Sequence, residues 1–579
     1  MTDSASISAT PSAWSYVTPL YLGWRVYWAN RMPIMDCDEV YNYWEPLHFL
    51  LYGTGFQTWE YANKFALRTY AYLMPLVGIS KIYQMLIPYL PAWLWPLLTT
   101  DQTVLVNAST VTDSLASVPS DGKVALFVLL RATLAAAMAY AELSFCQAIA
   151  HQSKTERIRV ASLTTGGLLL LSAGMSHAAG ALLPSSSLML LWLLAASAFL
   201  KGQHLWFATL AITATLAIGW PFGVLMFVPL GLSVLYHERS RIFLFLFQIA
   251  LLAAAIQGVV MAVDYQQYGK WVSPTWNILI YNTKAGGDEL YGIEPWSYYV
   301  KNLALNFNYV AAAGIVSLPL IVVWSRDNTA LLMTLVPMYV WLGVVFPRPH
   351  KEERFLFPIY PCLCLGASLL SVTVIDSAWR WIRKTPLSIR SALAIQVLLW
   401  SPAAILSFSR TLALSKYYSA PLHVYSQFDH HPDVADSVLC TCGEWYRFPS
   451  SFYLPSTIQS FGFVQCSFEG QLPQPFQSTG SRPNESIHFN DQNRPELSAY
   501  TSIDDCDFLV DLFSSTDCRE NDSIWKPVAL GSFLDSERTT STLHRTLYIP
   551  VLHEREEESG SVAYVDYILY QRKATEGSI

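Results

Sequence analysis

The chain has 579 residues; 53% of them are apolar, only 14% are charged, and the mean hydropathy is +0.30. This balance is typical of a polytopic membrane protein and excludes an ordinary soluble enzyme. The formal net charge of −7, without a Lys/Arg-rich tail or stripe, argues against nucleic acid as a partner.

Apolar runs long enough to cross a bilayer recur from the N-terminus to about residue 410. Residues Met1–Ala13 lack the charged region and cleavage site of a removable signal peptide, so we expect the first apolar run to stay in the membrane. Leu73–Leu98 is also apolar, but its prolines, Trp and Tyr favour a re-entrant or surface-lying helix. We predict about eleven transmembrane helices, near residues 14–30, 124–150, 160–176, 182–200, 204–219, 222–236, 242–263, 309–325, 329–346, 355–375 and 390–409.

The charges of the short connections predict how these helices are oriented. Basic residues fall in every second connection, as the positive-inside rule expects of cytoplasmic loops. The lumenal side then receives the loops 32–123, 264–308 and 347–354, together with everything after about residue 410. Three Asn-x-Ser/Thr sequons fall on this side and are candidate glycosylation sites: Asn107, Asn484 and Asn521.

The composition becomes polar at about residue 411. We therefore predict a transmembrane catalytic domain over residues 1–410 and a lumenal C-terminal domain, α/β or β-rich, over residues 411–579. Its β-prone runs include Asp507–Leu512, Thr546–Leu552 and Ser561–Tyr570.

Cysteine usage also suits an oxidising compartment for this domain. Disulfides could form among five cysteines, although spacing does not reveal the pairing: Cys440, Cys442, Cys466, Cys506 and Cys518. A zinc site is not expected, because Cys440-Thr-Cys442 lacks the usual spacing and no matching His pair follows.

Carboxylates and aromatic residues gather in the predicted lumenal loops. The run Asp36-Cys37-Asp38-Glu39 directly follows the first apolar segment and belongs at the bilayer surface, because burying such acids in lipid is costly. Acidic side chains bind sugar hydroxyls, and aromatic faces stack on pyranose rings. The residues predicted to bind an acceptor sugar are Trp44, Glu45, Trp59, Glu60, Tyr291, Glu294 and Trp296.

A basic loop precedes a late span. His350, Lys351 and Arg354 suit a phosphate at the membrane surface. The loop could also be a solvated turn with local ion pairs, Lys351–Glu352 or Glu353–Arg354, and His350 could be an interfacial hydrogen-bonding residue.

Together these groups predict transfer of a sugar from a lipid phosphate. One carboxylate of the first loop would act as general base, which typically contributes about 10²- to 10⁴-fold in rate, while the basic loop holds the phosphate. Asp36-x-Asp38 resembles the metal-binding pair of nucleotide-sugar transferases. A lipid-phosphate leaving group needs only one negative charge stabilised, however, so we expect neither a metal nor another cofactor.

Longer motifs make the resemblance to a family specific. His350-Lys351-Glu352-Glu353-Arg354-Phe355, paired with the early Asp-Glu, resembles the signature of dolichyl-phosphate-mannose-dependent mannosyltransferases with the GT-C fold. Further segments are similar to the α-1,2-mannosyltransferases of N-glycan precursor assembly: 35–39, 42–46, 55–61, 172–175, 183–186, 219–222, 291–296 and 444–451.

This resemblance implies a multi-pass enzyme of the endoplasmic reticulum membrane with a lumenal active site. It would move mannose from dolichyl phosphate mannose to a dolichyl-diphosphate-linked oligosaccharide, on two different arms. A β-linked donor and an α-linked product make the transfer inverting. By position, Asp38 would be the base, with Asp36 and Glu39 orienting it or the acceptor; which of the three takes the proton stays open. His350, Lys351 and Arg354 would hold the donor phosphate.

Two alternatives remain at this stage. One is a sister transferase that uses the same donor for an α-1,6 bond or for glycosylphosphatidylinositol precursors; the Trp-Glu-Pro and Trp-Tyr-Arg-Phe-Pro motifs disfavour it. The other is a transporter of lipid-linked oligosaccharides or a non-catalytic scaffold. A transporter should place ionisable groups near the bilayer midplane, whereas here they gather at one surface.

Overall fold

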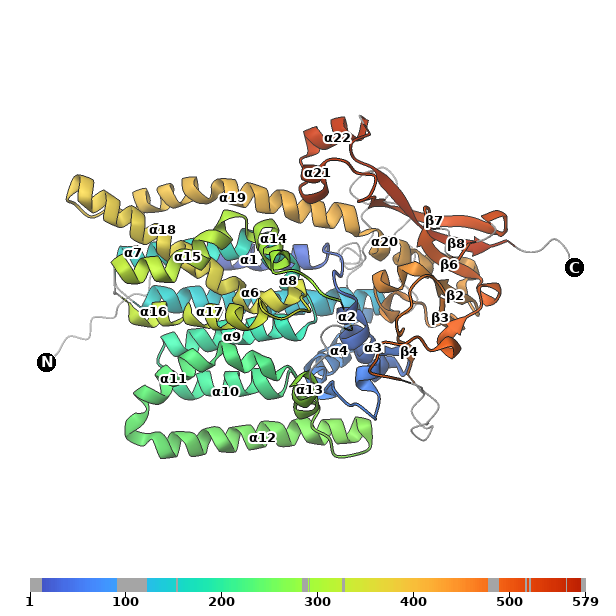
Figure 1. Cartoon of the computed structure of the whole chain (residues 1–579), viewed down its shortest axis with the longest axis horizontal. Helices are drawn as coiled ribbons and strands as arrows, with labels where there is room; N and C mark the ends of the chain where they lie inside the picture. Colours follow the sequence, from blue (N-terminus) through green and yellow to red (C-terminus); the bar gives the residue numbers. More distant parts are fainter. Residues whose placement is uncertain are drawn as a thin grey trace, which may run out of the picture.

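A bundle of helices carries a mixed α/β domain at one end (Figure 1). We call this the domain end of the bundle. The computed structural model describes residues 13–90, 122–152, 155–283, 290, 292–324, 328–476, 489–515, 518–519, 522–558 and 560–573.

Each of the eleven predicted spans lies in helical structure. The helices of the bundle are α1 (Ala13–Ala29), α6 (Lys123–His151), α7 (Glu156–Leu171), α8 (Ala173–Ala178), α9 (Pro184–Leu200), α10 (His204–Leu216), α11 (Val228–His237), α12 (Ile242–Tyr268), α15 (Tyr309–Trp324), α16 (Thr329–Met333), α17 (Val336–Val345), α18 (Tyr360–Arg383) and α19 (Ile389–Tyr418). Shorter helices lie between them: α2 (Cys37–Glu39), α3 (Glu45–Tyr52), α4 (Met74–Leu86), α13 (Pro274–Thr283) and α14 (Ser297–Phe307).

The predicted count of eleven spans is not confirmed. Within the described ranges, four helical segments are long and apolar enough to cross a membrane, or five if the bent pair α14 and α15 is one span. Other predicted spans form apolar helices of 10–17 residues. Prolines explain part of this shortening, because Pro221 and Pro337 each stand in the first turn of a new helical segment, where the missing N–H is tolerated. The surface-lying helix expected over 73–98 is represented by α4; residues 91–98 lie outside the described part.

Close packing fixes the centre of the bundle around α18. In the apolar window of the segment Glu353–Arg383, 89% of the residues are buried, whereas the corresponding share for α12, at the lower edge of Figure 1, is 6%. Two glycines let α15 approach α18. A Cβ on Gly314 would lie 2.6 Å from the carbonyl oxygen of Leu363, and one on Gly366 would lie 2.9 Å from that of Gly314. Small residues at such crossings are typical of helix contacts in membranes.

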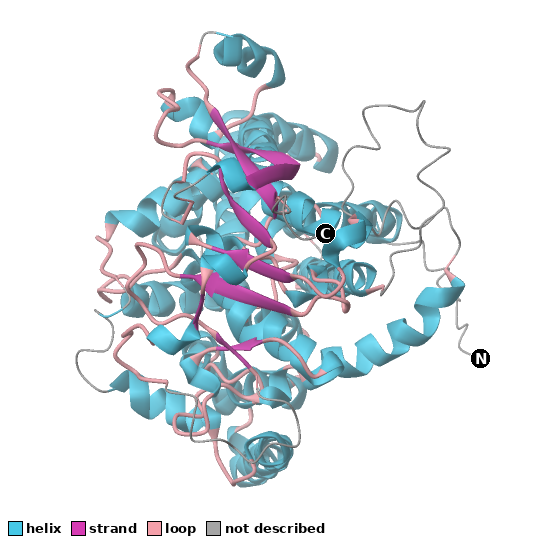
Figure 2. Ribbon diagram, turned by 90° about the vertical axis from the view of Figure 1, so that its right-hand side faces the viewer, coloured by secondary structure: helices cyan, strands magenta, loops and turns pink. Residues whose placement is uncertain are grey.

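The C-terminal domain is built on a six-stranded mixed sheet, whose strands are drawn in magenta in Figure 2. The strand order is β5-β3-β2-β6-β8-β7; the first four strands are parallel, and β8 is antiparallel to β6 and β7. The bounds are β2 (Val438–Thr441), β3 (Ser460–Val464), β5 (Tyr500–Thr501), β6 (Phe508–Leu512), β7 (Trp525–Leu534) and β8 (Tyr564–Arg572), with helices α20 (Ala420–Ser426), α21 (Thr542–Thr546) and α22 (Pro550–Glu558).

Two of the three predicted β-prone runs are confirmed as strands, β6 and β8. The strand expected over Thr546–Leu552 is wrong, because this run joins two helices. Ser541 caps the first helix by accepting a hydrogen bond from the backbone N–H of His544 at 3.3 Å, and Pro550 begins the second. The helix α19 also continues past the boundary predicted at residue 410 and ends at Tyr418.

Two disulfides staple the sheet: Cys440–Cys506 and Cys442–Cys518. They join the end of β2 to segments on either side of β6. Of the five cysteines predicted for this domain, Cys466 is the one that stays free. The expectation of disulfides within this set of cysteines is therefore confirmed.

The C-terminal domain is joined to the segment that follows α1. The carboxylate of Glu45 accepts hydrogen bonds from Ser451 N at 2.6 Å, from Ser451 Oγ at 2.7 Å and from Ser450 Oγ at 2.9 Å. A two-stranded antiparallel pair, β1 (Phe56–Gln57) with β4 (Gln474–Pro475), adds backbone bonds. These contacts hold the domain over the acidic run.

Candidate active site

A cavity of about 500 Å³ opens where the bundle meets the C-terminal domain. Its walls come from the segment after α1, from α13, from the loop before α18 and from the C-terminal domain. Five of the predicted site residues line it: Asp38, Trp59, Glu60, His350 and Arg354. The segments that the sequence assigns to one surface therefore converge at one place.

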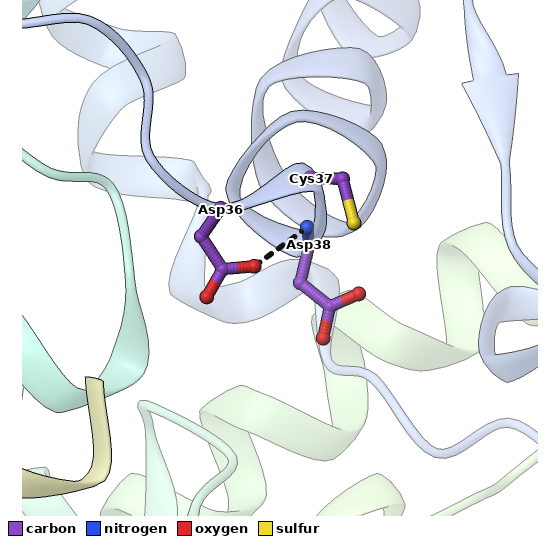
Figure 3. Close-up of side chains that lie close together, drawn as sticks. All are labelled: Asp36, Cys37 and Asp38. Carbon is purple, nitrogen blue, oxygen red and sulfur yellow. Dashed lines mark hydrogen bonds between the residues drawn. The ribbon is translucent and has the colours of Figure 1, made fainter. Parts of the chain in front are cut away.

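Asp36 and Asp38 share one helical turn. Asp36 precedes the short helix α2 and caps it, because its carboxylate accepts a hydrogen bond from the backbone N–H of Asp38 at 2.9 Å. Figure 3 shows both carboxylates extending from this turn. The Asp38 side chain is 34% exposed and lines the cavity, whereas Asp36 is 23% exposed and lies beside it.

Arg354 joins the two aspartates to the basic loop. Its Nη2 lies 2.5 Å from Asp38 Oδ2, its Nε lies 3.3 Å from Asp36 Oδ2, and its Nε also pairs with Glu352. Burial raises the pKa of Asp36 to about 7, although the charge of Arg354 opposes this shift. Burial also acts to raise the pKa of Glu352, but the charges of Arg354 and His350 outweigh it and lower that pKa to about 2. Among the acids that contact Arg354, burial thus favours the protonated form of Asp36, and the charges of Arg354 and His350 favour the ionised form of Glu352.

His350 and Lys351 occupy different places. His350 lines the cavity, with Nε2 3.0 Å from Glu352 Oε1, and this hydrogen bond raises the pKa of His350 and favours its cationic form. Lys351 is 7% exposed and donates a hydrogen bond to the carbonyl oxygen of Arg348. Glu352 therefore pairs with His350 and Arg354 instead of forming the local pair with Lys351 considered above.

A second charged pair lines the same cavity: Glu60, which the sequence predicted, and Arg68, which the sequence reasoning missed. Arg68 donates two hydrogen bonds to Glu60, from Nε at 3.0 Å and from Nη2 at 2.8 Å, and a third from Nη1 to Tyr43 Oη at 2.7 Å. Burial raises the pKa of Glu60, opposed by the charge of Arg68. An isolated arginine beside two acid-rich motifs was the signal that could have found it.

Glu39 does not line the cavity. It is 3% exposed, and its Oε1 accepts hydrogen bonds from Trp44 Nε1 and from Leu182 N, both at 2.9 Å. Burial raises the pKa of this carboxyl. Glu39 therefore anchors the turn of the two aspartates to the loop before α9, and it cannot reach a ligand in the cavity.

Trp44 and Glu45, predicted to bind the acceptor, are both fully buried at 0% exposure. The Glu45 carboxylate accepts hydrogen bonds from the C-terminal domain, and the Trp44 ring packs on Phe127 at a centroid distance of 4.5 Å. Their role in this structure is to hold the segment after α1 in place.

Two of the other predicted acceptor residues, Glu294 and Trp296, are described, and neither lines the cavity. Trp296 is 66% exposed, and the backbone N–H of Glu294 bonds to the carbonyl oxygen of Pro349 at 3.0 Å, next to the basic loop. Tyr291 and the three sequon asparagines lie outside the described residues: Asn107, Asn484 and Asn521.

The C-terminal domain supplies one wall of the cavity that the sequence reasoning did not place there. This wall, called the C-terminal wall below, consists of Trp445, Phe468, Gln471, Leu472, Pro473 and Asn493. Trp445 lies in the quoted motif 444–451, but no signal in the sequence identified the others as site residues.

The ligand atoms of Asp36, Cys37 and Asp38 lie within 4.8 Å of one another, the one such grouping found among the described residues. Arg354 contacts both aspartates of this group. Its guanidinium already supplies the positive charge that a divalent ion would bring. We therefore keep the expectation of a metal-independent site as a prediction.

Comparison with known proteins shows the family of the chain. The model of the Alg9-like mannosyltransferase family matches residues 16–455. The chain belongs to this family. It is 34% identical to the mouse α-1,2-mannosyltransferase ALG9, over 93% of this chain and 86% of the mouse protein. The Arabidopsis thaliana protein of the same name is 34% identical over 91% of this chain and 87% of its own length. The chain is accordingly a glycosyltransferase of the ALG9 type.

Two more distant similarities complete the comparison. The zebrafish GPI α-1,2-mannosyltransferase 3 is 26% identical over 59% of this chain and 56% of its own length. Among solved structures, ArnT from Cupriavidus metallidurans bound to undecaprenyl phosphate has a TM-score of 0.43 and 13% identity, over 78% of this chain and 85% of that one.

Proposed function

We propose that the protein is an inverting α-1,2-mannosyltransferase. It moves mannose from dolichyl phosphate mannose to a dolichyl-diphosphate-linked oligosaccharide, on two different arms, at the lumenal face of the endoplasmic reticulum membrane. The observation that carries the proposal is the meeting of Asp38, His350 and Arg354 in one cavity of an Alg9-like chain. A base and two cationic groups are what attack on a lipid-phosphate sugar requires.

Arg354 and His350 are assigned to the donor phosphate. Both line the cavity, and Arg354 has several donors for phosphate oxygens. In the substrate-free site its charge is shared among three carboxylates, so phosphate binding would exchange some of these contacts for phosphate contacts. Lys351 donates a hydrogen bond to the backbone of the loop and thereby stabilises it.

Asp38 is assigned as the general base. Glu39 is buried and Asp36 caps a helix and carries a raised pKa, so Asp38 is the acid of this run that faces the cavity. Asp38 takes the proton of the acceptor hydroxyl as that oxygen attacks the anomeric carbon. The bond from this carbon to the phosphate oxygen breaks, and dolichyl phosphate leaves with the bonding electron pair. One displacement turns the β-linked donor into an α-linked product.

Product analysis tests this proposal. Purified protein is supplied with dolichyl phosphate mannose and synthetic lipid-linked glycans truncated on either arm. The expected product carries one added α-1,2-linked mannose on each of two acceptor types, with unchanged yield in the presence of a chelator. An α-1,6-linked product would instead support the sister transferase. Loss of transfer with the chelator, restored by a divalent ion, would revive a metal site at Asp36 and Asp38.

A further inference from the structure

The C-terminal wall differs in chemistry from the rest of the cavity. Of the described residues that this domain contributes to the lining, none is charged. The other lining segments hold the ionisable groups Asp38, Glu60, Arg68, His350, Glu352 and Arg354. A phosphate needs cationic partners, whereas a neutral oligosaccharide needs amides for its hydroxyls and flat apolar faces for its rings.

The C-terminal wall offers both kinds of group. The Trp445 and Phe468 rings pack together at a centroid distance of 4.8 Å, and both are only partly buried. The side chain of Asn493 is half-buried at the cavity and uses its Oδ1 to accept a hydrogen bond from the backbone N–H of Gln471 at 3.0 Å. Among the contacts of the described residues, the NH₂ group of Asn493 donates no hydrogen bond within the protein.

This wall is rigid before any ligand binds. The side-chain amide of Gln471 bonds twice to the backbone of Asn490, donating to its carbonyl at 3.2 Å and accepting from its N–H at 2.9 Å. No Cβ fits at Gly470, since it would lie 2.3 Å from the Phe468 ring and 3.0 Å from Asn493 Oδ1. Tyr41 Oη donates to the carbonyl oxygen of Trp445 at 2.7 Å. Such prior ordering lowers the entropic cost of binding.

We propose that the C-terminal wall is the subsite for the acceptor oligosaccharide, with Trp445 and Phe468 stacking on sugar rings and Asn493 donating to a hydroxyl. This inference rests on the proposed function and assigns its two substrates to different lining segments. The donor phosphate lies against Arg354 and His350, and the acceptor glycan lies against the C-terminal domain. Acceptor recognition thereby moves away from Trp44 and Glu45, whose side chains are buried.

Two conservative variants test the subsite. Asn493 has a positive φ of 51°, so Asn493→Asp is chosen because aspartate tolerates this backbone region and keeps the acceptor for Gln471 while losing the NH₂ donor. Phe468→Leu keeps an apolar side chain but removes the flat ring. Glu469→Gln, at an exposed position on the same loop, is the control.

Initial rates are measured with the purified full-length protein, varying the donor and the acceptor in turn. We expect each test variant to raise the acceptor KM roughly tenfold, the effect of losing about one good contact, while the donor KM stays within about twofold of wild type. Glu469→Gln should match wild type. The defect should shrink with an acceptor trimmed to its terminal mannose residues, since the lost contacts are to more distant rings.

Three results would overturn the assignment: unchanged kinetics in both variants, a raised donor KM with an unchanged acceptor KM, or a defect independent of glycan length. Thermal unfolding of each variant is measured alongside; a variant that unfolds early is replaced by Trp445→Phe. Transfer by the wild-type protein from dolichyl phosphate mannose distinguishes failure of the proposed function from failure of the subsite. If wild type transfers no mannose, the proposed function itself fails, whereas normal wild-type transfer with unaffected variants contradicts the subsite alone.

Discussion

One arginine offsets part of the negative charge around the acidic run. Arg354 contacts Asp36, Asp38 and Glu352, so three carboxylates compete for one fixed positive charge. Glu352 has a second partner in His350 and remains ionised, whereas burial pushes the pKa of Asp36 up to about 7. Asp38 lies beside Arg354 with its side chain 34% exposed. The environment of each acid thus separates its role from that of its neighbours.

The raised pKa of Asp36 predicts a pH-dependent stability. Because the folded pKa of about 7 lies above the unfolded value of roughly 3.9, folding takes up a proton between these limits. The contribution of this group is therefore full below about pH 4 and is lost as the pH rises through about 7. Asp36→Asn keeps the cap of α2 but has no proton to lose. Its melting temperature relative to wild type should rise from about pH 5 to about pH 8 in detergent. A constant or falling difference would contradict the assigned pKa.

The reacting groups lie on two short elements, the turn of α2 and the basic loop before α18. His177 lies next to the basic loop and close to the turn. His177, in α8, has Nε2 2.9 Å from Glu353 Oε1, and Asn306 donates to the same oxygen at 2.7 Å. Glu353 adjoins Glu352 and Arg354 in the basic loop. Burial raises the pKa of Glu39, which anchors the turn of the aspartates; the charge of Arg131 opposes this shift most strongly, and His177 opposes it less. The helix α8 therefore couples the basic loop to the acidic turn.

His177→Ala should disturb this coupling without touching a substrate. We expect kcat to fall roughly tenfold and the donor KM to rise, since a misplaced Arg354 binds phosphate less well. His177→Gln can still donate to Glu353 and should restore part of the rate. His237→Ala, at an exposed position, is the matched control and should behave as wild type. Equal loss in the Ala and Gln variants would show that His177 acts only through packing.

At the scale of the whole molecule, the docked C-terminal domain completes the cavity by supplying one of its walls. Glu45 is the main polar link between the two parts, since it also accepts the backbone N–H of Phe56 at 3.0 Å, beside β1. Two disulfides make the docked domain stiff behind this contact. Substrate binding between two separately anchored walls depends on that docking.

Glu45→Ala should loosen the domain. It leaves the donors of Ser450, Ser451 and Phe56 buried without their acceptor, which costs at least about 3 kcal/mol. We expect a lower melting temperature and faster proteolysis of the C-terminal domain, together with loss of transfer. Glu496→Gln, in which only a local exposed turn is affected, should leave all three unchanged. If the Glu45→Ala variant is proteolysed at the wild-type rate, the backbone pairing of β1 with β4 is sufficient to keep the C-terminal domain docked.

Patterns among residues that are neighbours in the sequence were enough to predict three features. These are the helical bundle, the division of the chain into two parts and the charged side of the cavity. Asp38 and Arg354 stand in short motifs beside apolar runs and could be found. The C-terminal wall could not, because Asn493 reaches the cavity through a fold that pairs residues more than 400 positions apart, such as Tyr41 and Trp445. The strand expected over Thr546–Leu552 failed because capping and proline geometry outweighed β-propensity.

The central claim is that Asp38 is the base of a single displacement. The most direct measurement is the rate of mannose transfer by purified Asp38→Asn, with dolichyl phosphate mannose and a lipid-linked glycan acceptor. We predict a loss of at least about 10²-fold in rate, with near-native thermal unfolding and donor binding, because the amide cannot accept the proton. Turnover within a few-fold of wild type would contradict the one-base mechanism and return the search for the proton acceptor to the rest of the cavity.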